Sequence, residues 1–366
     1  MDELKAKIVA LYLPQYHPTP DNDLWWGEGF TEWTNVAKAK KLYRNHYQPR
    51  IPANLGFYDL RLLEVREKQA EMAKRAGVTA FCYYHYWFGN GKQELERPFN
   101  EVVASGKPDF PFCICWANHS WSLKEWNHDG TSKNKLLCEQ LYPGENDNEQ
   151  HFYSLLEAFK DPRYLKYKGK LVFVIYSPMT FTGCSEFMKQ WNGLARKNGL
   201  EGFHFIGHCQ NPKSEKEIQE MMDKGFNAVN VLRLSNWAYG SHNMLNRAKN
   251  YVSHYILNRP YINDYKRILP NFVGEIDRQT NVYPSIIPNW DHTPRSGRGG
   301  YLYENCEPKL FEKHCRMVID EVKDKPKEDR IIFLKSWNEW GEGNYMEPDL
   351  RYGYGYIDAL KRALTE

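Results

Sequence analysis

The sequence predicts a single-domain (β/α)8 TIM barrel over residues 1–366. The length of 366 residues and a hydrophobic content of 42% suit one large barrel core. Eight short, almost continuously apolar runs recur along the chain, as expected for parallel strands that are buried on both faces. Since no Gly-x-Gly-x-x-Gly or Walker-type loop follows any of these runs, a doubly wound open sheet is the less favoured alternative.

The first strand is expected at 6–13, which is an apolar run close to the N-terminus. Residues 14–58 follow as a polar and aromatic connection of about 45 residues, and connections of this length are usually functional or disordered. Its high Trp and Tyr content argues against disorder. Residues 60–76 read as an amphipathic helix that ends at Gly77.

The pattern of strand and helix then repeats along the rest of the chain. Further strands are expected at 78–84, 112–117, 170–176, 203–207, 228–232, 283–287 and 331–336, and helices at 93–106, 148–160, 184–198, 213–224, 307–322 and 356–365. The strand at 228–232 is the weakest, and the mixed helical and irregular stretch 235–280 forms a second long connection. Pro and Gly are spread throughout, so no domain linker is predicted.

The composition of the chain argues against some kinds of partner, such as nucleic acid and a membrane. The net charge is +3 with Lys and Arg dispersed, which argues against nucleic acid. The eight Cys show no disulfide framework, and four of them lie in apolar runs and are expected to be buried thiols: Cys82, Cys113, Cys115 and Cys209. No apolar stretch reaches 18 residues and no signal region opens the chain, so we expect no transmembrane segment and a cytoplasmic location. No cofactor is predicted.

Polar and aromatic residues gather where five of the eight strands end. Active sites of barrels lie at the C-terminal ends of the strands, so these residues are expected to meet around one substrate groove. The predicted substrate-binding residues are Tyr16, His17, Trp33, His85, Tyr86, Trp87, Trp116, Asn118, His119, Trp121, Asn289, Trp290, Asp291, Arg295, Trp337 and Asn338.

Several of these residues have a second interpretation. The three histidines are alternatively metal ligands, but no carboxylate or Cys stands at a zinc spacing from them, so no metal site is predicted. Trp33 either lines the groove or packs the long connection. Arg295 either pairs with Asp291 or binds an anionic substituent of the substrate.

The last strand leads into the most informative stretch. Glu339 and Glu342 lie three residues apart on a turn that contains Gly341 and Gly343, between indole side chains. Glycoside chemistry uses two carboxyl groups whose environments give one the role of acid and the other that of base. An extended strand would place the two on opposite faces, whereas a tight turn can direct both into the barrel mouth. We therefore predict that Glu339 and Glu342 are the catalytic pair.

The motifs together resemble a known family. They are Tyr12-Leu-Pro-Gln-Tyr-His17, Gly29-Phe-Thr-Glu-Trp33, Tyr84-His-Tyr-Trp87, Trp116-Ala-Asn-His119, Asn289-Trp-Asp291 and Trp337-Asn-Glu-Trp-Gly-Glu-Gly343. Over nearly the whole chain they look like those of WbsX-type bacterial polysaccharide-locus proteins, which are often labelled glycosyltransferases. These are similar to glycoside hydrolase family 99, the endo-α-mannosidases. That likeness implies a (β/α)8 barrel and chemistry without a metal.

The resemblance also implies roles for the two carboxyl groups. Glu339 would draw the proton from the 2-hydroxyl of the sugar, whose oxygen attacks the anomeric carbon and forms an anhydro-sugar intermediate. Glu342 would protonate the leaving oxygen and later activate water. This retaining route suits α-manno- or α-rhamno-configured sugars. Position 341 is Gly here, where the endo-mannosidases typically carry His.

Three functions are compatible with these residues. The first is a glycoside hydrolase that acts on an oligosaccharide or polysaccharide. The second is a glycosyltransferase of O-antigen or surface-polysaccharide biosynthesis, although the sequence carries no Asp-x-Asp or phosphate-binding Gly loop. The third, a non-catalytic glycan-binding barrel, is disfavoured because both Glu residues are present.

Overall fold

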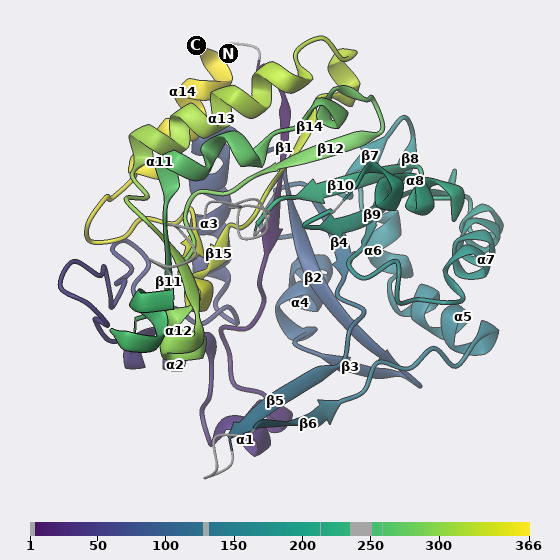
Figure 1. Cartoon of the computed structure of the whole chain (residues 1–366). Coiled ribbons are helices and arrows are strands. Elements are labelled where there is room, and N and C mark those ends of the chain that lie inside the picture. The colour runs from purple at the N-terminus through teal and green to yellow at the C-terminus, as the bar shows by residue number, and fades with distance from the viewer. Residues whose placement is uncertain (1–3, 127–131, 213, 235–250, 258) are drawn as a thin grey trace.

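The computed structural model describes residues 4–126, 132–212, 214–234, 251–257 and 259–366. Eight parallel strands close into a barrel in the order β1-β14-β12-β10-β9-β8-β4-β2, with β2 pairing back onto β1 (Figure 1). Their bounds are β1 Lys7–Tyr12, β2 Ala80–Gly89, β4 Phe112–Trp116, β8 Lys170–Ile175, β9 Phe203–Gln210, β10 Ala228–Leu232, β12 Val282–Ile286 and β14 Ile331–Leu334. The predicted (β/α)8 TIM barrel is confirmed.

Helices cover the outside of this barrel (Figure 1). The main ones are α3 Leu63–Ala76, α4 Arg97–Ser105, α5 Glu145–Ser154, α6 Leu156–Lys160, α7 Cys184–Lys197, α8 Glu215–Asp223, α13 Pro308–Val322 and α14 Gly355–Thr365. Between β10 and β12 the described residues form short turns of helix and one short strand, in agreement with the mixed pattern of 235–280; residues 235–250 lie outside the described part. The two ends of the chain approach each other, where the Lys5 amide donates to the Leu364 carbonyl at 3.1 Å.

Burial explains why these segments fold as they do. The five residues of β8 after Lys170 are all buried, because strands of a closed parallel barrel are covered on both faces. Helix α7 is amphipathic and places Trp191 on the ring of Phe173 from β8, with centroids 4.9 Å apart. Large aromatic side chains therefore fill the layer between the strands and the outer helices.

The long connection 14–58 is more ordered than its sequence suggests. It contains α1 Pro20–Trp26, whose N-terminus is capped by the Thr19 hydroxyl, and α2 Glu32–Lys38. Each helix has seven residues, about two turns, which is too short to produce a visible helical period in the sequence. The sequence predicts no helix within this connection, and the structure adds these two.

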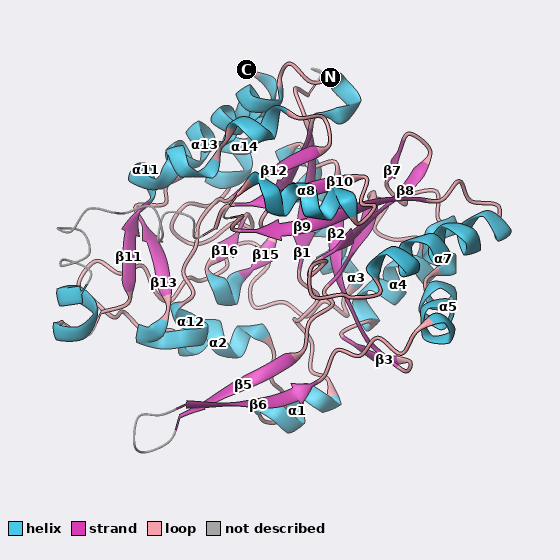
Figure 2. Ribbon diagram, turned by 45° about the vertical axis from the view of Figure 1, so that its right-hand side comes forward, coloured by secondary structure: helices cyan, strands magenta, loops and turns pink. Residues whose placement is uncertain are grey.

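A second unpredicted feature follows β4. The sequence predicts no strand between the strand at 112–117 and the helix at 148–160, but this stretch contains an antiparallel hairpin of β5 Trp121–Trp126 and β6 Ser132–Cys138. Figure 2 shows this hairpin extending from the barrel beside α1, and the rings of Trp25 and Trp121 meet there at 5.7 Å. The hairpin therefore forms one wall above the strand ends.

Smaller elements complete the chain. They are β3 Lys92–Glu94, β7 Lys166–Tyr167, a π-helical turn Val252–Ile256, β11 Tyr261–Asp264, α11 Tyr265–Ile268, α12 Thr293–Ser296, β13 Tyr301–Glu304, β15 Asn338–Glu339 and β16 Asn344–Tyr345, with 3-10 turns at Leu269–Phe272, Glu275–Arg278, Gly297–Gly299, Lys327–Asp329 and Trp340–Glu342. In the part of the chain that the structure describes, no helix combines the length and the apolar character needed to cross a bilayer.

Candidate active site

A cavity of about 490 Å³ opens at the C-terminal ends of the barrel strands. Glu339 and Glu342 both line it, together with Lys335 and Arg295. The aromatic residues of its walls come from α1 and the segment after it, the strand ends and the hairpin: Trp26, Phe30, Tyr84, Tyr86, Trp121, Tyr176 and Trp290. A volume of this size, with aromatic walls and a few convergent charged groups, is typical of a small-molecule or glycan site.

The turn that carries the two carboxyl groups is held rigidly. Gly343 adopts φ 53°, and a side chain at this position would meet the Cβ of Asp291 at 2.7 Å. The Ser336 hydroxyl donates to the Asn344 carbonyl at 2.7 Å and accepts from the Glu339 amide at 3.1 Å. The hydroxyl thus bonds to both sides of the turn, and both Glu339 and Glu342 extend from the turn to the cavity.

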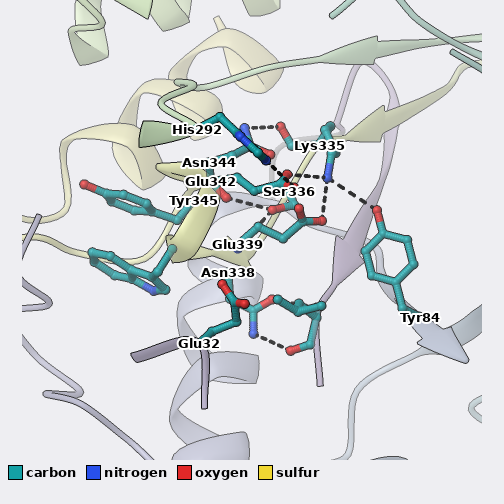
Figure 3. A network of polar contacts seen from close by, with 12 residues as sticks. Glu32, Tyr84, His292, Lys335, Ser336, Asn338, Glu339, Glu342, Asn344 and Tyr345 are labelled. Carbon is teal, nitrogen blue, oxygen red and sulfur yellow. Dashed lines mark hydrogen bonds and ion pairs between the residues drawn. The ribbon is translucent and has the colours of Figure 1, made fainter. Parts of the chain in front are cut away.

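Two cations contact the carboxyl groups, and Figure 3 shows one of them, Lys335, beside Glu339 and Glu342. The Lys335 Nζ atom donates to Glu339 Oε1 at 2.5 Å and to Glu342 Oε2 at 3.4 Å. Arg295 donates from Nη1 to Glu342 Oε1 at 2.5 Å, while its Nη2 atom lies 3.0 Å from Glu32 Oε2. Glu32, from α2, thus joins the site as a third carboxyl group.

The environments of the two catalytic candidates separate their protonation. Burial, together with the negative charge of Glu342, raises the pKa of Glu339 to about 8, although Lys335 acts in the opposite direction. Burial alone would also raise the pKa of Glu342, but Lys335 and Arg295 outweigh it and hold that pKa well below its usual range. At neutral pH the pair therefore holds one proton, which lies on Glu339, as in other closely spaced carboxyl pairs.

Seven of the predicted site residues line the cavity: Tyr86, His119, Trp121, Trp290, Arg295, Glu339 and Glu342. Trp121 is the first residue of the hairpin, and the centroid of its ring lies 5.0 Å from that of Tyr86. The centroid of the Trp290 ring lies 5.9 Å from the Lys335 Nζ atom. The cavity therefore combines aromatic rings with the charged cluster.

Three predicted residues point outward into the helical layer. Strand β2 is longer than predicted and includes His85 and Trp87. Because side chains alternate along a strand, Tyr84 and Tyr86 face the cavity while His85 and Trp87 face away from it. Trp87 donates to Asp147 of α5 at 3.0 Å, and the Trp116 indole donates to the Trp87 carbonyl at 2.9 Å.

The His85 side chain also faces away from the cavity, because its Nε2 atom lies 2.9 Å from the Nε2 atom of His151 in α5. Burial lowers the pKa of His85 to about 3, so the ring is neutral. The predicted position of His85, Trp87 and Trp116 in the groove is therefore wrong, and their contacts are those of core residues.

Another group connects the first strand to the carboxyl-bearing turn. The Tyr16 hydroxyl donates to the Asn338 carbonyl and accepts from the Trp340 amide at 3.0 Å. Asn338 bonds through its side chain to both the amide and the carbonyl of Leu13, at 2.8 and 3.0 Å. Trp33 packs on Tyr16 with ring centroids 4.7 Å apart. These residues are buried beneath the cavity and position the turn.

The remaining predicted residues also lie outside the cavity. His17 contacts the Pro14 carbonyl at 3.1 Å, and Trp337 is fully buried against Phe81. Asn118 accepts from the Ser177 amide at 2.7 Å.

Two residues after β12 support the turn from behind. Asn289 accepts from the Tyr345 amide at 2.9 Å. Asp291 accepts from His46 and Gln48 at 2.9 and 2.8 Å. The suggested pairing of Arg295 with Asp291 is wrong, because Arg295 pairs with Glu32 and Glu342 instead.

Two charged residues of the site were not predicted. Lys335 lies four residues before Glu339, and the signal for it was a single Lys in an otherwise apolar strand run. Glu32 lies in the Gly29-Phe-Thr-Glu-Trp33 motif, which was noted without a role for the Glu. Among the described residues, no group of three or more His, Cys, Asp or Glu side chains is arranged to hold a metal ion.

Solved structures with the same fold include carbohydrate-active enzymes. A protein described as glycoside hydrolase-like superposes with a TM-score of 0.60 at 14% identity, covering 100% of this chain and 96% of the other. A GH99 endo-alpha-mannosidase from Bacteroides thetaiotaomicron gives a TM-score of 0.55 at 15% identity, covering 99% and 96%. At these identities the likeness establishes the barrel fold alone.

Sequence comparison gives a relative and a matching family. The uncharacterized protein WxcX of Xanthomonas campestris pv. campestris is 33% identical over the whole of this chain. The chain spans about half the length of that relative. A family model described as glycosyltransferase WbsX matches residues 8–360. Because this match covers almost the whole chain, the chain belongs to the WbsX glycosyltransferase family.

Proposed function

We propose that this protein acts on the glycosidic bonds of an oligosaccharide or polysaccharide, with Glu339 and Glu342 as the catalytic pair of a glycoside-hydrolase-like site. The observation that carries the proposal is that both carboxyl groups face one cavity while their environments leave them a single proton. A pair in this state supplies an acid and a base at the same pH, which glycosidic-bond cleavage requires.

The cavity walls support a sugar substrate. Tyr86, Trp121 and Trp290 offer flat apolar faces, on which the C–H side of a sugar ring packs. His119 lies among them with its side chain accessible to solvent, and partial desolvation in the cavity lowers the pKa of its imidazole, which favours a neutral ring that can hydrogen-bond a hydroxyl. We assign these four residues to substrate binding.

The reaction proceeds with retention and participation of the 2-hydroxyl. In the first step the base takes the 2-hydroxyl proton, the 2-oxygen bonds to the anomeric carbon, and the acid transfers its proton to the leaving oxygen as the glycosidic bond breaks. In the second step water opens the anhydro ring, and both protons return. The route requires a 2-hydroxyl trans to the leaving group, as in α-mannosides and α-rhamnosides.

The roles implied by the family resemblance place the acid on Glu342, whereas the resting proton lies on Glu339. A hydrogen bond joins the two carboxyl groups. Transfer of the proton along it leaves the charge of the pair unchanged and converts the resting state to the reactive one. Substrate contacts at Glu342 are expected to drive this transfer.

The first test is incubation with a panel of α-linked manno- and rhamno-oligosaccharides in water, with detection of new reducing ends. Hydrolysis by the parent is expected to fall by about 10²–10⁴-fold in Glu339→Gln and in Glu342→Gln. Glu28→Gln, at an exposed position, is the matched control. Parent activity in either catalytic variant would remove that residue from the mechanism.

Leaving-group chemistry assigns the roles. An aryl glycoside whose phenol leaves without protonation needs the base but not the acid in the first step. With such a substrate, Glu342→Gln should regain formation of the anhydro sugar while Glu339→Gln stays inactive. The opposite result would exchange the roles of the two residues.

A transferase is the second candidate, and the description of the matching family favours it. The same pair would then activate a sugar hydroxyl in place of water. Product formed only from an activated sugar donor, with no release of reducing ends from the panel, would favour assembly of a polysaccharide over its cleavage.

A further inference from the structure

Glu32 has no part in the bond-breaking steps, yet it is one of the most enclosed charged groups of the cavity. It lies at the first position of α2, and only 3% of its surface is exposed. Its Oε2 atom accepts from Arg295 Nε at 3.1 Å, and its Oε1 atom accepts from Asn35 at 3.3 Å. Arg295 therefore bridges Glu32 and Glu342 with one guanidinium group.

The catalytic turn is shaped to admit this carboxylate. A Cβ atom at Gly341 would lie 1.8 Å from Glu32 Oε2, so any side chain there would displace Glu32. Gly341 does not adopt a positive φ, and its backbone conformation is therefore accessible to other residues. The requirement for glycine at this position is steric, and it keeps Glu32 beside the segment that joins Glu339 to Glu342.

Charge counting gives Glu32 a role. Three carboxyl groups of the cluster, Glu32, Glu339 and Glu342, meet two cations, Arg295 and Lys335. The cluster is electrically neutral when one carboxyl group carries a proton. An excess negative charge in a buried site is costly, so that proton is retained.

The other titratable groups that face the cluster are uncharged at neutral pH, so they do not change its net charge. Burial lowers the pKa of His292, whose Nε2 atom lies 3.9 Å from Glu342. The neighbouring tyrosines have pKa values raised by burial and are neutral: Tyr16, Tyr84, Tyr86, Tyr176 and Tyr301.

We propose that Glu32 is a positioning residue of this active site: by pairing with Arg295 across Gly341, it keeps one proton on the Glu339–Glu342 pair. Without its charge, two carboxyl groups face two cations, so both ionise and the pair loses its acid. The inference rests on the proposed function for its catalytic meaning, but the proton itself can be observed without turnover.

The test follows the proton in the ligand-free protein. Protein with ¹³C-labelled Glu side-chain carboxyls is titrated by NMR, and the pair is assigned with Glu339→Gln and Glu342→Gln. We expect the midpoint at which the pair loses its proton to fall by about one pH unit or more in Glu32→Gln, as for removal of a neighbouring like charge. Glu28→Gln should leave the midpoint unchanged.

Gly341→Ala provides a second, steric route to the same state. It should displace Glu32 from Arg295 and lower the midpoint in the same direction, and it serves alone if Glu32→Gln does not fold. An unchanged or higher midpoint in the folded variants overturns the proposal. Absence of hydrolysis by the parent would instead count against the proposed function, and the titration result would stand. If the parent hydrolyses a substrate, the alkaline limb of the kcat/KM profile should move to lower pH in these variants, by the same amount as the midpoint.

Discussion

Lys335→Met is expected to move the pH range of activity upward. The Lys335 ammonium lies 2.5 Å from Glu339 and 3.4 Å from Glu342, and it is buried with them. Methionine preserves an unbranched side chain of similar length without the charge. The cluster would then hold three carboxyl groups and one cation, and the carboxyl pair would take up a second proton at higher pH than in the parent.

The size of the pKa shift can be calculated from the longer of the two distances, that between Lys335 Nζ and Glu342 Oε2. Two unit charges 3.4 Å apart interact by about 5 kcal/mol at an effective dielectric constant of about 20. One pKa unit corresponds to about 1.36 kcal/mol, so the upper bound is a rise of about 3–4 units for Glu342. A single charged neighbour typically moves a carboxyl pKa by about 1–3 units, and we expect the acidic limb to rise by that amount.

The assay is kcat/KM between about pH 4 and about pH 10 on an oligosaccharide that the parent cleaves. Below its pKa the base is protonated, so at a fixed pH on the raised limb activity should fall about tenfold for each pH unit by which the limb has moved. Lys323→Met, at a half-exposed position on the outer surface, is the control. Circular dichroism checks the fold. An acidic limb that stays in place or moves down in folded Lys335→Met would refute the electrostatic argument.

Three further predictions concern stability and the aromatic walls. Trp116→Ala should lower the free energy of unfolding in urea by about 3–5 kcal/mol with KM unchanged, because Trp116 is 2% exposed in the helical layer. Trp121→Ala should instead raise KM about tenfold with little loss of stability, because Trp121 lines the cavity; the reverse pattern would contradict their placement. Glu339→Gln should flatten the fall in stability between about pH 4.5 and about pH 8. The parent loses stability as pH rises there because folded Glu339 keeps a proton that the unfolded chain releases.

The sequence by itself determined the barrel. Eight apolar runs, most followed by an amphipathic helical stretch, leave few arrangements that bury both faces of each strand, and the strands lie where these runs predict them. It also determined that Glu339 and Glu342 leave one glycine-containing turn at a strand end, because that geometry depends only on residues close together in the chain.

Only the tertiary structure decided which residues meet the two carboxyl groups. Tyr86 and Trp87 are adjacent in sequence, but the length of β2 and the alternation of its side chains send one into the cavity and the other toward α5. Glu32 reaches Arg295 across 263 positions of the chain because α2 packs over the strand ends. Short-range patterns carry no information on such contacts, since they arise from how distant segments pack. The charge balance that decides the protonation of the Glu339–Glu342 pair therefore could not be predicted from the sequence.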